Sequence, residues 1–180
     1  MRRLLTIAAA LLLTLSLFSA TLEKLDFDEM VAKSTAIVRG RIGSSYTTTK
    51  GSMIYTHYKV QILERWKGVP ASEIDIVVPG GSLGSVRQQF SGTPKLAAGA
   101  EQVLFLWTGK SGLTHIIGLT QGLFDVKIDA NGESIATRAA SSETMLDRTT
   151  GQPVKDEAIA TRLLDLSARI SRSVAQGAAR

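Results

Sequence analysis

Residues 53–66 read MIYTHYKVQILERW, and apolar side chains alternate with polar ones along most of this stretch. The positions expected on the inner face are Ile54, Thr56, Tyr58, Val60 and Ile62, and those on the outer face are Tyr55, His57, Lys59 and Gln61. A period of two residues is typical of a β-strand. The mixture of residue types on the outer side predicts a strand with one buried face and one solvent-exposed face.

The segment before this strand predicts its hairpin partner. Residues 34–43, STAIVRGRIG, alternate in the same way, and the polar residues 44–52 are expected to form the loop between the two strands. Further upstream, apolar residues at helical spacing predict a short helix over residues 22–33. Asp26 can cap that helix, because its side chain can accept a hydrogen bond from an unpaired backbone N–H of the first turn.

The segment after the long strand predicts five more strands. They are expected at residues 73–78, 103–107, 113–119, 123–128 and 134–138. The run 103–107, VLFLW, is apolar throughout, which indicates a strand covered on both faces. Asn131 and Gly132 supply the positive φ angles of a tight hairpin between the last two strands. Short connections of this kind favour a largely antiparallel sheet.

These elements predict a mainly β fold, a small antiparallel OB-like barrel of six to seven strands with an N-terminal and a C-terminal helix. A β-sandwich is the alternative that the same strands allow. The barrel domain is expected to span residues 21–140, and residues 141–180 to form a polar linker and an amphipathic helix that packs on the barrel. The apolar stripe of that helix is Ile159, Leu163, Leu166, Ile170 and Val174.

Residues 1–20 have the order of a secretory signal peptide. Arg2 and Arg3 come first, an apolar run follows as far as Phe18, and small residues end at Ala20. We therefore expect an exported protein, periplasmic or extracellular. An uncleaved N-terminal anchor is the alternative, and it is the only route by which we expect the chain to meet a membrane.

The composition restricts the chemistry. Lys and Arg total 21 against 16 Asp and Glu, two of the basic residues lie in the signal segment, and the others are spread along the chain. Such a mild excess does not predict a nucleic-acid partner. The chain has no cysteine and two histidines, which excludes a disulfide framework and most zinc-site designs. We expect neither a metal nor a cofactor.

Several short motifs occur together between Ile37 and Val126. They read VRGRI, ERWKG, VPGG, GAEQVLFL and GLTQGLF in this chain. In this combination the chain resembles a family of secreted bacterial β-rich proteins, and more distantly the OB-like netrin barrels of metalloproteinase inhibitors. The resemblance implies a barrel fold and export. Netrin modules inhibit through cysteines near their amino terminus, which this chain lacks, so the resemblance implies no activity and no site residues.

Residues 80–84, GGSLG, fit the G-x-S-x-G pattern of serine hydrolases. That pattern requires a helix after the serine, and an acid and a histidine later in the chain. Residues 85–91 are a poor helix, and Glu101 is the only acidic residue between Ser82 and His115. We interpret the glycines as points where the backbone bends, and keep a serine hydrolase using Ser82 and His115 as an alternative.

The candidate binding residues lie in two places. Trp66 and Lys67 end the long strand, where a ring and a cation can meet a ligand at the barrel rim. The connection from Pro79 to Gly99 is long, and loops of this length are uncommon unless they have a function or contain structure of their own. The side chains that it offers are Arg87, Gln88, Gln89 and Phe90. We therefore expect a non-catalytic binding module for a protein or glycan partner, with a structural envelope protein as a further alternative.

Overall fold

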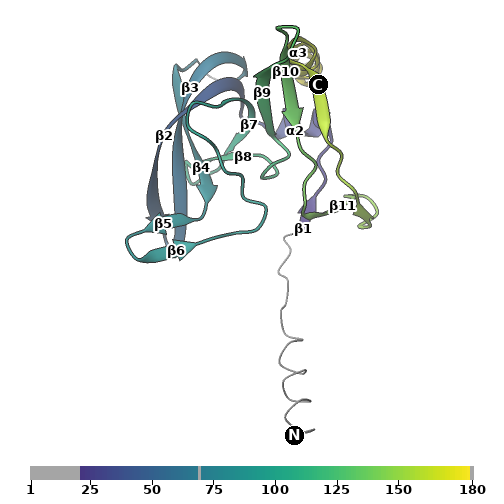
Figure 1. The fold of residues 1–180 in the computed structure, drawn as a ribbon. Coiled ribbons are helices and arrows are strands. Elements are labelled where there is room, and N and C mark those ends of the chain that lie inside the picture. The colour runs from purple at the N-terminus through teal and green to yellow at the C-terminus, as the bar shows by residue number, and fades with distance from the viewer. Residues whose placement is uncertain (1–20, 69, 179–180) are drawn as a thin grey trace, which may run out of the picture.

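A computed structural model describes residues 21–68 and 70–178, so the expected signal peptide, residues 1–20, lies outside the described residues. Short strands dominate, and the helices are α2 and α3 (Figure 1). The elements are β1 (Thr21–Glu23), α2 (Phe27–Lys33), β2 (Ala36–Lys50), β3 (Met53–Lys67), β4 (Glu73–Pro79), β5 (Gly81–Leu83), β6 (Val86–Gln88), β7 (Glu101–Thr108), β8 (Thr114–Ile116), β9 (Leu123–Ile128), β10 (Ser134–Arg138), β11 (Thr144–Leu146), β12 (Pro153–Val154), β13 (Ile159–Arg162) and α3 (Leu163–Ala178).

Strands β2, β3, β4, β8 and β7 pair in a ring, because β7 pairs with β2 at one edge and with β8 at the other. The pairing of β4 with β8, at Val77 and His115, is parallel, and the other pairings in the ring are antiparallel. This is the connectivity of an OB-fold, a five-stranded barrel. The predicted mainly β, OB-like fold is confirmed, although the ring itself uses five strands.

The remaining strands of the large sheet extend it beyond the barrel. Strand β7 is long enough for one end to pair with β8 and the other with β9, and β10 and β13 follow outward from β9. Alternation along β7 then supplies two cores. Val103 and Phe105 face the helices, whereas Leu104 and Leu106 face the barrel interior. All four side chains are buried, so the prediction of a strand covered on both faces is confirmed.

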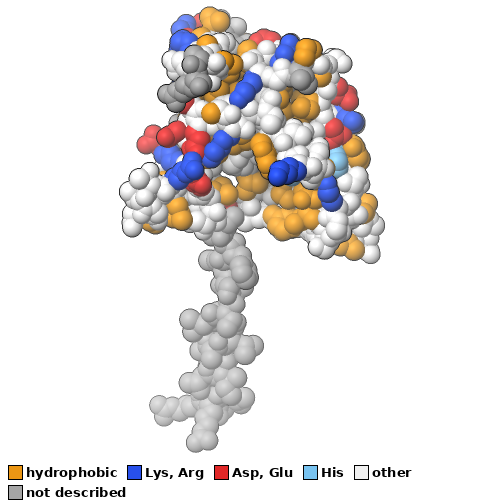
Figure 2. All heavy atoms as spheres, turned by 180° about the vertical axis from the view of Figure 1, so that it is seen from behind, with side chains coloured by type: hydrophobic (Ala, Val, Ile, Leu, Met, Phe, Trp, Pro, Cys, Tyr) orange, Lys and Arg blue, Asp and Glu red, His pale blue; other side chains and the backbone are white. Residues whose placement is uncertain are grey.

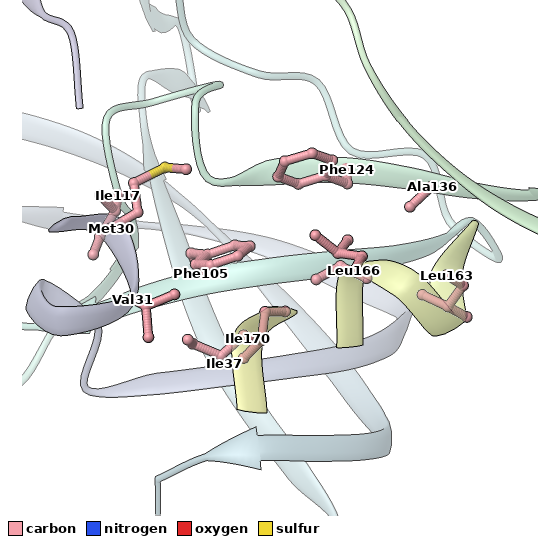
Figure 3. Close-up of a cluster of buried hydrophobic side chains, with 11 residues drawn as sticks. Met30, Val31, Ile37, Phe105, Ile117, Phe124, Ala136, Leu163, Leu166 and Ile170 are labelled. Atoms are coloured by element: carbon pink, nitrogen blue, oxygen red, sulfur yellow. The ribbon is translucent and has the colours of Figure 1, made fainter. Parts of the chain in front are cut away.

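The helix-side core lies between this extended sheet and α2 and α3. Figure 3 shows Phe105 with Met30 and Val31 of α2 on one side and Leu166 and Ile170 of α3 on the other. Burying side chains of this size contributes roughly 1.5–3 kcal/mol each. The apolar stripe predicted for the C-terminal helix therefore packs as expected from Leu163 onward.

Several segments differ from the sequence-based prediction, and the strand expected at residues 113–119 is confined to Thr114–Ile116. Residues 44–50, expected to form a loop, continue β2, because the equally long β3 supplies hydrogen-bond partners and threonines suit a strand. The first helix begins at Phe27, and residues 21–23 instead pair in parallel with β11. Ile159 lies in β13, which adds to the edge of β10, so α3 begins only at Leu163.

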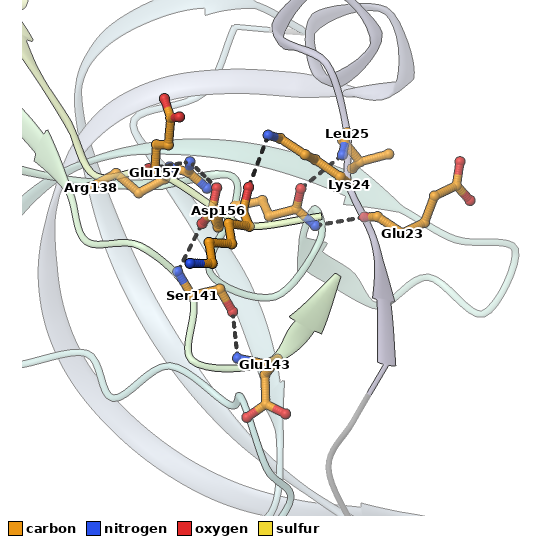
Figure 4. A network of polar contacts seen from close by, with 10 residues as sticks. Glu23, Lys24, Leu25, Arg138, Ser141, Glu143, Asp156 and Glu157 are labelled. Carbon is orange, nitrogen blue, oxygen red and sulfur yellow. Dashed lines mark hydrogen bonds and ion pairs between the residues drawn. The ribbon is translucent and has the colours of Figure 1, made fainter. Parts of the chain in front are cut away.

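Polar contacts hold the N-terminal segment and the segment after Arg138 in place, and the Lys24 ammonium joins the two by donating to the carbonyl of Lys155 (3.3 Å) (Figure 4). The buried Gln121 amide accepts a hydrogen bond from the backbone N–H of Leu25 (2.9 Å) and donates one to the carbonyl of Glu23 (2.9 Å). Arg138 pairs with Asp156 at 2.8 Å, and Asp156 also accepts from the backbone N–H of Ser141. The region expected to be a polar linker is thus built into the fold. Within the described residues, neither helix has the length and apolar character needed to cross a membrane.

Candidate interaction site

The connection after β4 folds into a hairpin, β5–β6, that lies at the end of the long β2–β3 pair where the chain turns from β2 into β3 (Figure 1). The backbone N–H of Gly80 donates to the carbonyl of Ile54 (2.8 Å). The Thr56 hydroxyl donates to the carbonyl of Gly80 (2.8 Å), and the Thr47 hydroxyl donates to the carbonyl of Ser82 (2.9 Å). These bonds hold the first strand of the hairpin against the barrel.

Gln88 fastens the second strand. Its Oε1 accepts from the backbone N–H of Ile54 (2.7 Å), and its Nε2 donates to the carbonyl of Ser52 (2.7 Å). The glycines before the hairpin make this close approach possible. A Cβ on Gly81, whose φ is +136°, would lie 2.5 Å from Oγ1 of Thr56. The positive φ angles of Gly80 (+96°) and Gly81 (+136°) agree with the interpretation of these glycines as points where the backbone bends, and the close approach of Gly81 to Thr56 is an additional packing role.

The anchored hairpin exposes a group of apolar side chains. Leu83 is 41% exposed, Val86 is 55% exposed and Phe90, just beyond β6, is 42% exposed. Arg87 is exposed as well, but it pairs with Ser82, so its side chain lies on the other face of the hairpin from the Leu83–Val86 pair. We call Leu83, Val86, Arg87 and Phe90 the hairpin surface. Its backbone is ordered in advance by the bonds from Gln88 and the threonines, which lowers the entropy lost on binding a partner.

A hollow of about 210 Å³ adjoins this surface. The residues that line it include all four candidates from the loop, Arg87, Gln88, Gln89 and Phe90, together with Thr56, Tyr58 and Val78 of the barrel wall and Thr93, Pro94 and Lys95 from the far end of the connection. Two cations, Arg87 and Lys95, line the hollow, and within the described residues no acidic side chain does. The hollow therefore favours a partner group that carries negative charge.

The other two candidates lie elsewhere and make structural contacts. Trp66 is partly buried and packs against the helix-side core, as Phe27 and Val174 also do. The Lys67 ammonium donates to the carbonyls of Val31 (2.7 Å) and Ala32 (3.0 Å), in the last turn of α2. Burial lowers the pKa of Lys67. A cation at the C-terminal carbonyls of a helix is a capping arrangement, so these two residues hold α2 on the barrel.

The residues of the hydrolase alternative are not assembled. Ser82 is exposed on β5, and among the hydrogen bonds of the described chain its hydroxyl has none to a histidine or a carboxylate. His115 lies on β8, with its ring 6.0 Å from that of Trp107 and 6.1 Å from that of Tyr55. Burial among these rings lowers the pKa of His115. Ser82 lies within the first strand of a hairpin, whereas a nucleophile elbow lies between a strand and a helix.

A polar cluster that sequence analysis did not assemble crosses β2, β3 and β4. Nδ1 of His57 lies 2.7 Å from Oδ1 of Asp75, and its Nε2 lies 2.8 Å from Oγ1 of Thr48. Tyr46 stacks on the imidazole at 4.5 Å and donates to Asp75 through its hydroxyl (2.8 Å). Lys59 pairs with Asp75 at 3.1 Å. The alternation of residues 53–66 places His57 and Lys59 on one face of the strand, and this pattern was the signal in the sequence for the cluster. It could not reveal Asp75, which comes from a different strand.

Partial burial raises the pKa of Asp75, but hydrogen bonds from His57, Tyr46 and Lys59 outweigh it and hold that pKa below its ordinary value. Asp75 in turn raises the pKa values of Tyr46 and Lys59. The strand pairing places every member in a regular ladder, with His57 directly opposite Tyr46. The cluster therefore cross-links three strands.

In residues 21–68 and 70–178, no three His, Asp or Glu side chains gather into a group that could hold a metal ion. Comparisons with protein-family models, with curated proteins and with solved structures found no match for this chain, so the family resemblance given by the motifs stays a prediction.

Proposed function

We propose that this protein is an exported, non-catalytic interaction module that binds a protein or glycan partner through the hairpin surface. The observation that carries the proposal is the exposure of Leu83, Val86 and Phe90 on a hairpin fastened to the barrel by Gln88. Clustered apolar side chains exposed to water mark interaction sites.

The size of the adjoining hollow favours a large partner. Pockets that enclose small molecules have volumes of about 300–1,000 Å³. The hollow beside Phe90 measures about 210 Å³, so it is suited to a protruding group of a partner that rests on the surface around it. Arg87 and Lys95 would pair with an acidic side chain or an acidic sugar at that point.

Charge distribution supports a partner other than nucleic acid. In Figure 2 acidic and basic side chains lie side by side over one face, with apolar side chains between them. A nucleic-acid-binding protein carries a continuous stripe of Lys and Arg along the path of the phosphate backbone. The export part of the proposal rests on residues 1–20, whose order is that of a signal peptide.

Site-specific photocrosslinking in the native host tests the proposal. A benzophenone amino acid is placed at Val86, at Phe90 or, as a control, at Leu164, an apolar residue of α3 that is 73% exposed. We expect one shared adduct from the two hairpin positions, absent at Leu164, and at least tenfold weaker binding of the purified partner by Val86→Ser.

Equal adducts from all three positions, or partner binding that Val86→Ser leaves intact, would contradict the proposal. Labelling by a fluorophosphonate probe tests the enzyme alternative directly. We expect no labelled protein, and a signal that disappears in Ser82→Ala would replace the interaction module with a serine hydrolase.

A further inference from the structure

The hollow beside the hairpin surface lies at one end of the barrel. Tyr58 and Val78, which line it, also belong to the core of the barrel interior, and Thr56 pairs with Val78 across β3 and β4. The other walls of the hollow are formed by the β5–β6 hairpin and by residues 93–95. The hollow is therefore the mouth of the barrel, and the hairpin forms one side of its rim.

One face of the hairpin belongs to this mouth. Arg87 pairs with Ser82, so the two side chains lie on the same face of the hairpin, and both residues line the hollow. Leu83 and Val86 pair on the other face and do not line it. The hairpin thus presents its polar, cationic face to the hollow and keeps its apolar face outside it.

Two cations at the mouth have no partner in the described chain. Arg87 and Lys95 are both exposed, and neither side chain forms an ion pair or a hydrogen bond with the described residues. Among the described residues that line the hollow, none is acidic. Lys59, on the outer face of the same barrel, is instead paired with Asp75. The positive charge at the mouth is therefore uncompensated, and a negatively charged ligand can compensate it.

Neutral polar groups line the same mouth within reach of a ligand. The hydroxyls of Ser82 and Tyr58 and the side-chain amide of Gln89 form no hydrogen bond with the described residues. Ser82 and Gln89 are exposed and Tyr58 is partly exposed, so solvent and ligands can contact them. Hydroxyl and amide groups both donate and accept hydrogen bonds. The mouth therefore combines unpaired cations with accessible partners for hydroxyl groups.

The size of the hollow favours a sugar ring over a single acidic side chain. Its volume is about 210 Å³, about seven times the ~30 Å³ that one molecule occupies in liquid water. The carboxylate end of an aspartate or glutamate side chain fills only a small part of this space. A pyranose ring with its substituents fills much more of it and brings hydroxyl groups to the polar wall.

We propose that the barrel mouth binds an acidic sugar residue, one that carries a carboxylate or a phosphate group. The inference rests on the proposed function, because it assigns an acidic glycan as the partner of the hairpin surface. Arg87 and Lys95 pair with the acidic group, and the planar guanidinium of Arg87 can donate two parallel hydrogen bonds to it. The ring hydroxyls bond to Ser82, Tyr58 and Gln89.

Titration of the isotope-labelled protein with matched sugars, followed by amide NMR, tests the assignment. The acidic probes are methyl glucuronide, methyl galacturonide and methyl glucoside 6-phosphate, and methyl glucoside is the neutral control. We expect at least one acidic probe to shift amides of residues 56–58, 80–82 and 87–90 in a saturable manner. That probe should bind at least tenfold more tightly than methyl glucoside, and added salt should weaken it because solvent-exposed charge pairs are screened.

Variants of the two cations separate a binding role from a structural one. Arg87→Gln and Lys95→Gln should each weaken the acidic sugar at least tenfold, whereas Lys110→Gln, at an exposed lysine between β7 and β8, should leave its affinity unchanged. Because Arg87 and Lys95 have no partner in the described chain, both variants should keep the unfolding midpoint of the parent protein. Sugar binding that both variants leave intact overturns the proposal.

N-acetylglutamate methylamide distinguishes a glycan from a protein partner, because it supplies the carboxylate on a side chain without a ring. It should bind at least tenfold more weakly than the acidic sugar. The proposal is overturned if no acidic probe gives a saturable shift, if methyl glucoside binds equally well, or if the glutamate compound binds as tightly as the sugar. Each of these results leaves the hairpin surface in place as an interaction site, since crosslinking at Val86 tests that surface separately.

Discussion

Nδ1 of His57 lies 2.7 Å from Oδ1 of Asp75, so an imidazole on β3 is joined to a carboxylate on β4. Thr48 and Tyr46 on β2 contact the same pair, which connects three neighbouring strands of the barrel through polar side chains. A carboxylate that accepts several hydrogen bonds favours its charged form. The stability of the barrel wall is thereby linked to the protonation of one residue, Asp75.

Acid should weaken the barrel through Asp75. Its folded-state pKa lies below the ordinary value, so its stabilising contribution is complete above the ordinary carboxyl pKa and is lost as pH falls through the folded-state value. Asp75→Asn should lower the free energy of unfolding by about 1–2 kcal/mol at pH 7 and reduce its decline below about pH 4. Urea denaturation at a series of pH values measures both effects.

Glu73→Gln is the matched control for that series. Glu73 lies on the same strand, is more exposed and reaches Lys59 only at 3.6 Å. Its substitution should change the free energy of unfolding by less than about 0.5 kcal/mol at every pH. If the free energy of unfolding declined equally with falling pH in the Asp75→Asn variant and in the parent protein, Asp75 would not be the residue that links stability to pH.

Gly81→Ala should loosen the hairpin. The new Cβ would lie 2.5 Å from Oγ1 of Thr56 at a φ of +136°, so we expect a loss of about 3 kcal/mol in the free energy of unfolding. Gly84→Ala is the comparison, because a Cβ there meets nothing within 4 Å and only the φ of +59° opposes it. Its cost should be about 1 kcal/mol. Chemical denaturation ranks the two variants, and equal losses would refute the packing role of Gly81.

Gln121→Leu should detach the N-terminal segment. The substitution leaves the N–H of Leu25 and the carbonyl of Glu23 without their buried partner, at a cost of about 2–3 kcal/mol. Hydrogen exchange should show faster exchange at Leu25, while the amides of β3 stay protected. Gln61→Ala, at an exposed position of β3, provides the control. Unchanged exchange at Leu25 would contradict this role of Gln121.

Lys67→Met should affect α2 and spare partner binding. The ammonium of Lys67 donates to two carbonyls of the last helical turn, so its loss should cost about 1 kcal/mol of stability. Affinity for the crosslinked partner should stay within twofold of the parent value, because Lys67 does not line the hollow beside Phe90. A tenfold loss of affinity would return Lys67 to the binding surface.

Alternation and turn residues predicted the parts of the fold that depend on near neighbours. The strand at residues 53–66 and the hairpin around Gly132 are visible from the side-chain period and the turn chemistry. Strand β1 could not be predicted in the same way, since it exists only because residues 144–146 lie beside it. The extension of β2 through residues 44–50 likewise depends on the length of β3.

The candidate binding residues of the Pro79–Gly99 connection have different roles, and the role of Gln88 depends on contacts that are distant in the sequence. Arg87 and Phe90 were chosen because the connection is long, and they do line a hollow. Gln88 was chosen on the same grounds, yet its amide fastens the hairpin to Ile54 and Ser52. Its partners are 34 and 36 residues away in the chain, and no local pattern announces them.

The contacts of Gln121 with Glu23 and Leu25 have a kinetic consequence. They join positions 98 and 96 residues apart, and Lys24 reaches the carbonyl of Lys155 across 131 residues. Long-range contacts of this kind form slowly, because a large loop must close before any of them contributes. We therefore expect the pairing of β1 with β11 to form late in folding, after the barrel strands have paired. Until β1 pairs with it, β11 has an open edge with unpaired backbone groups, which could pair with a strand of another chain.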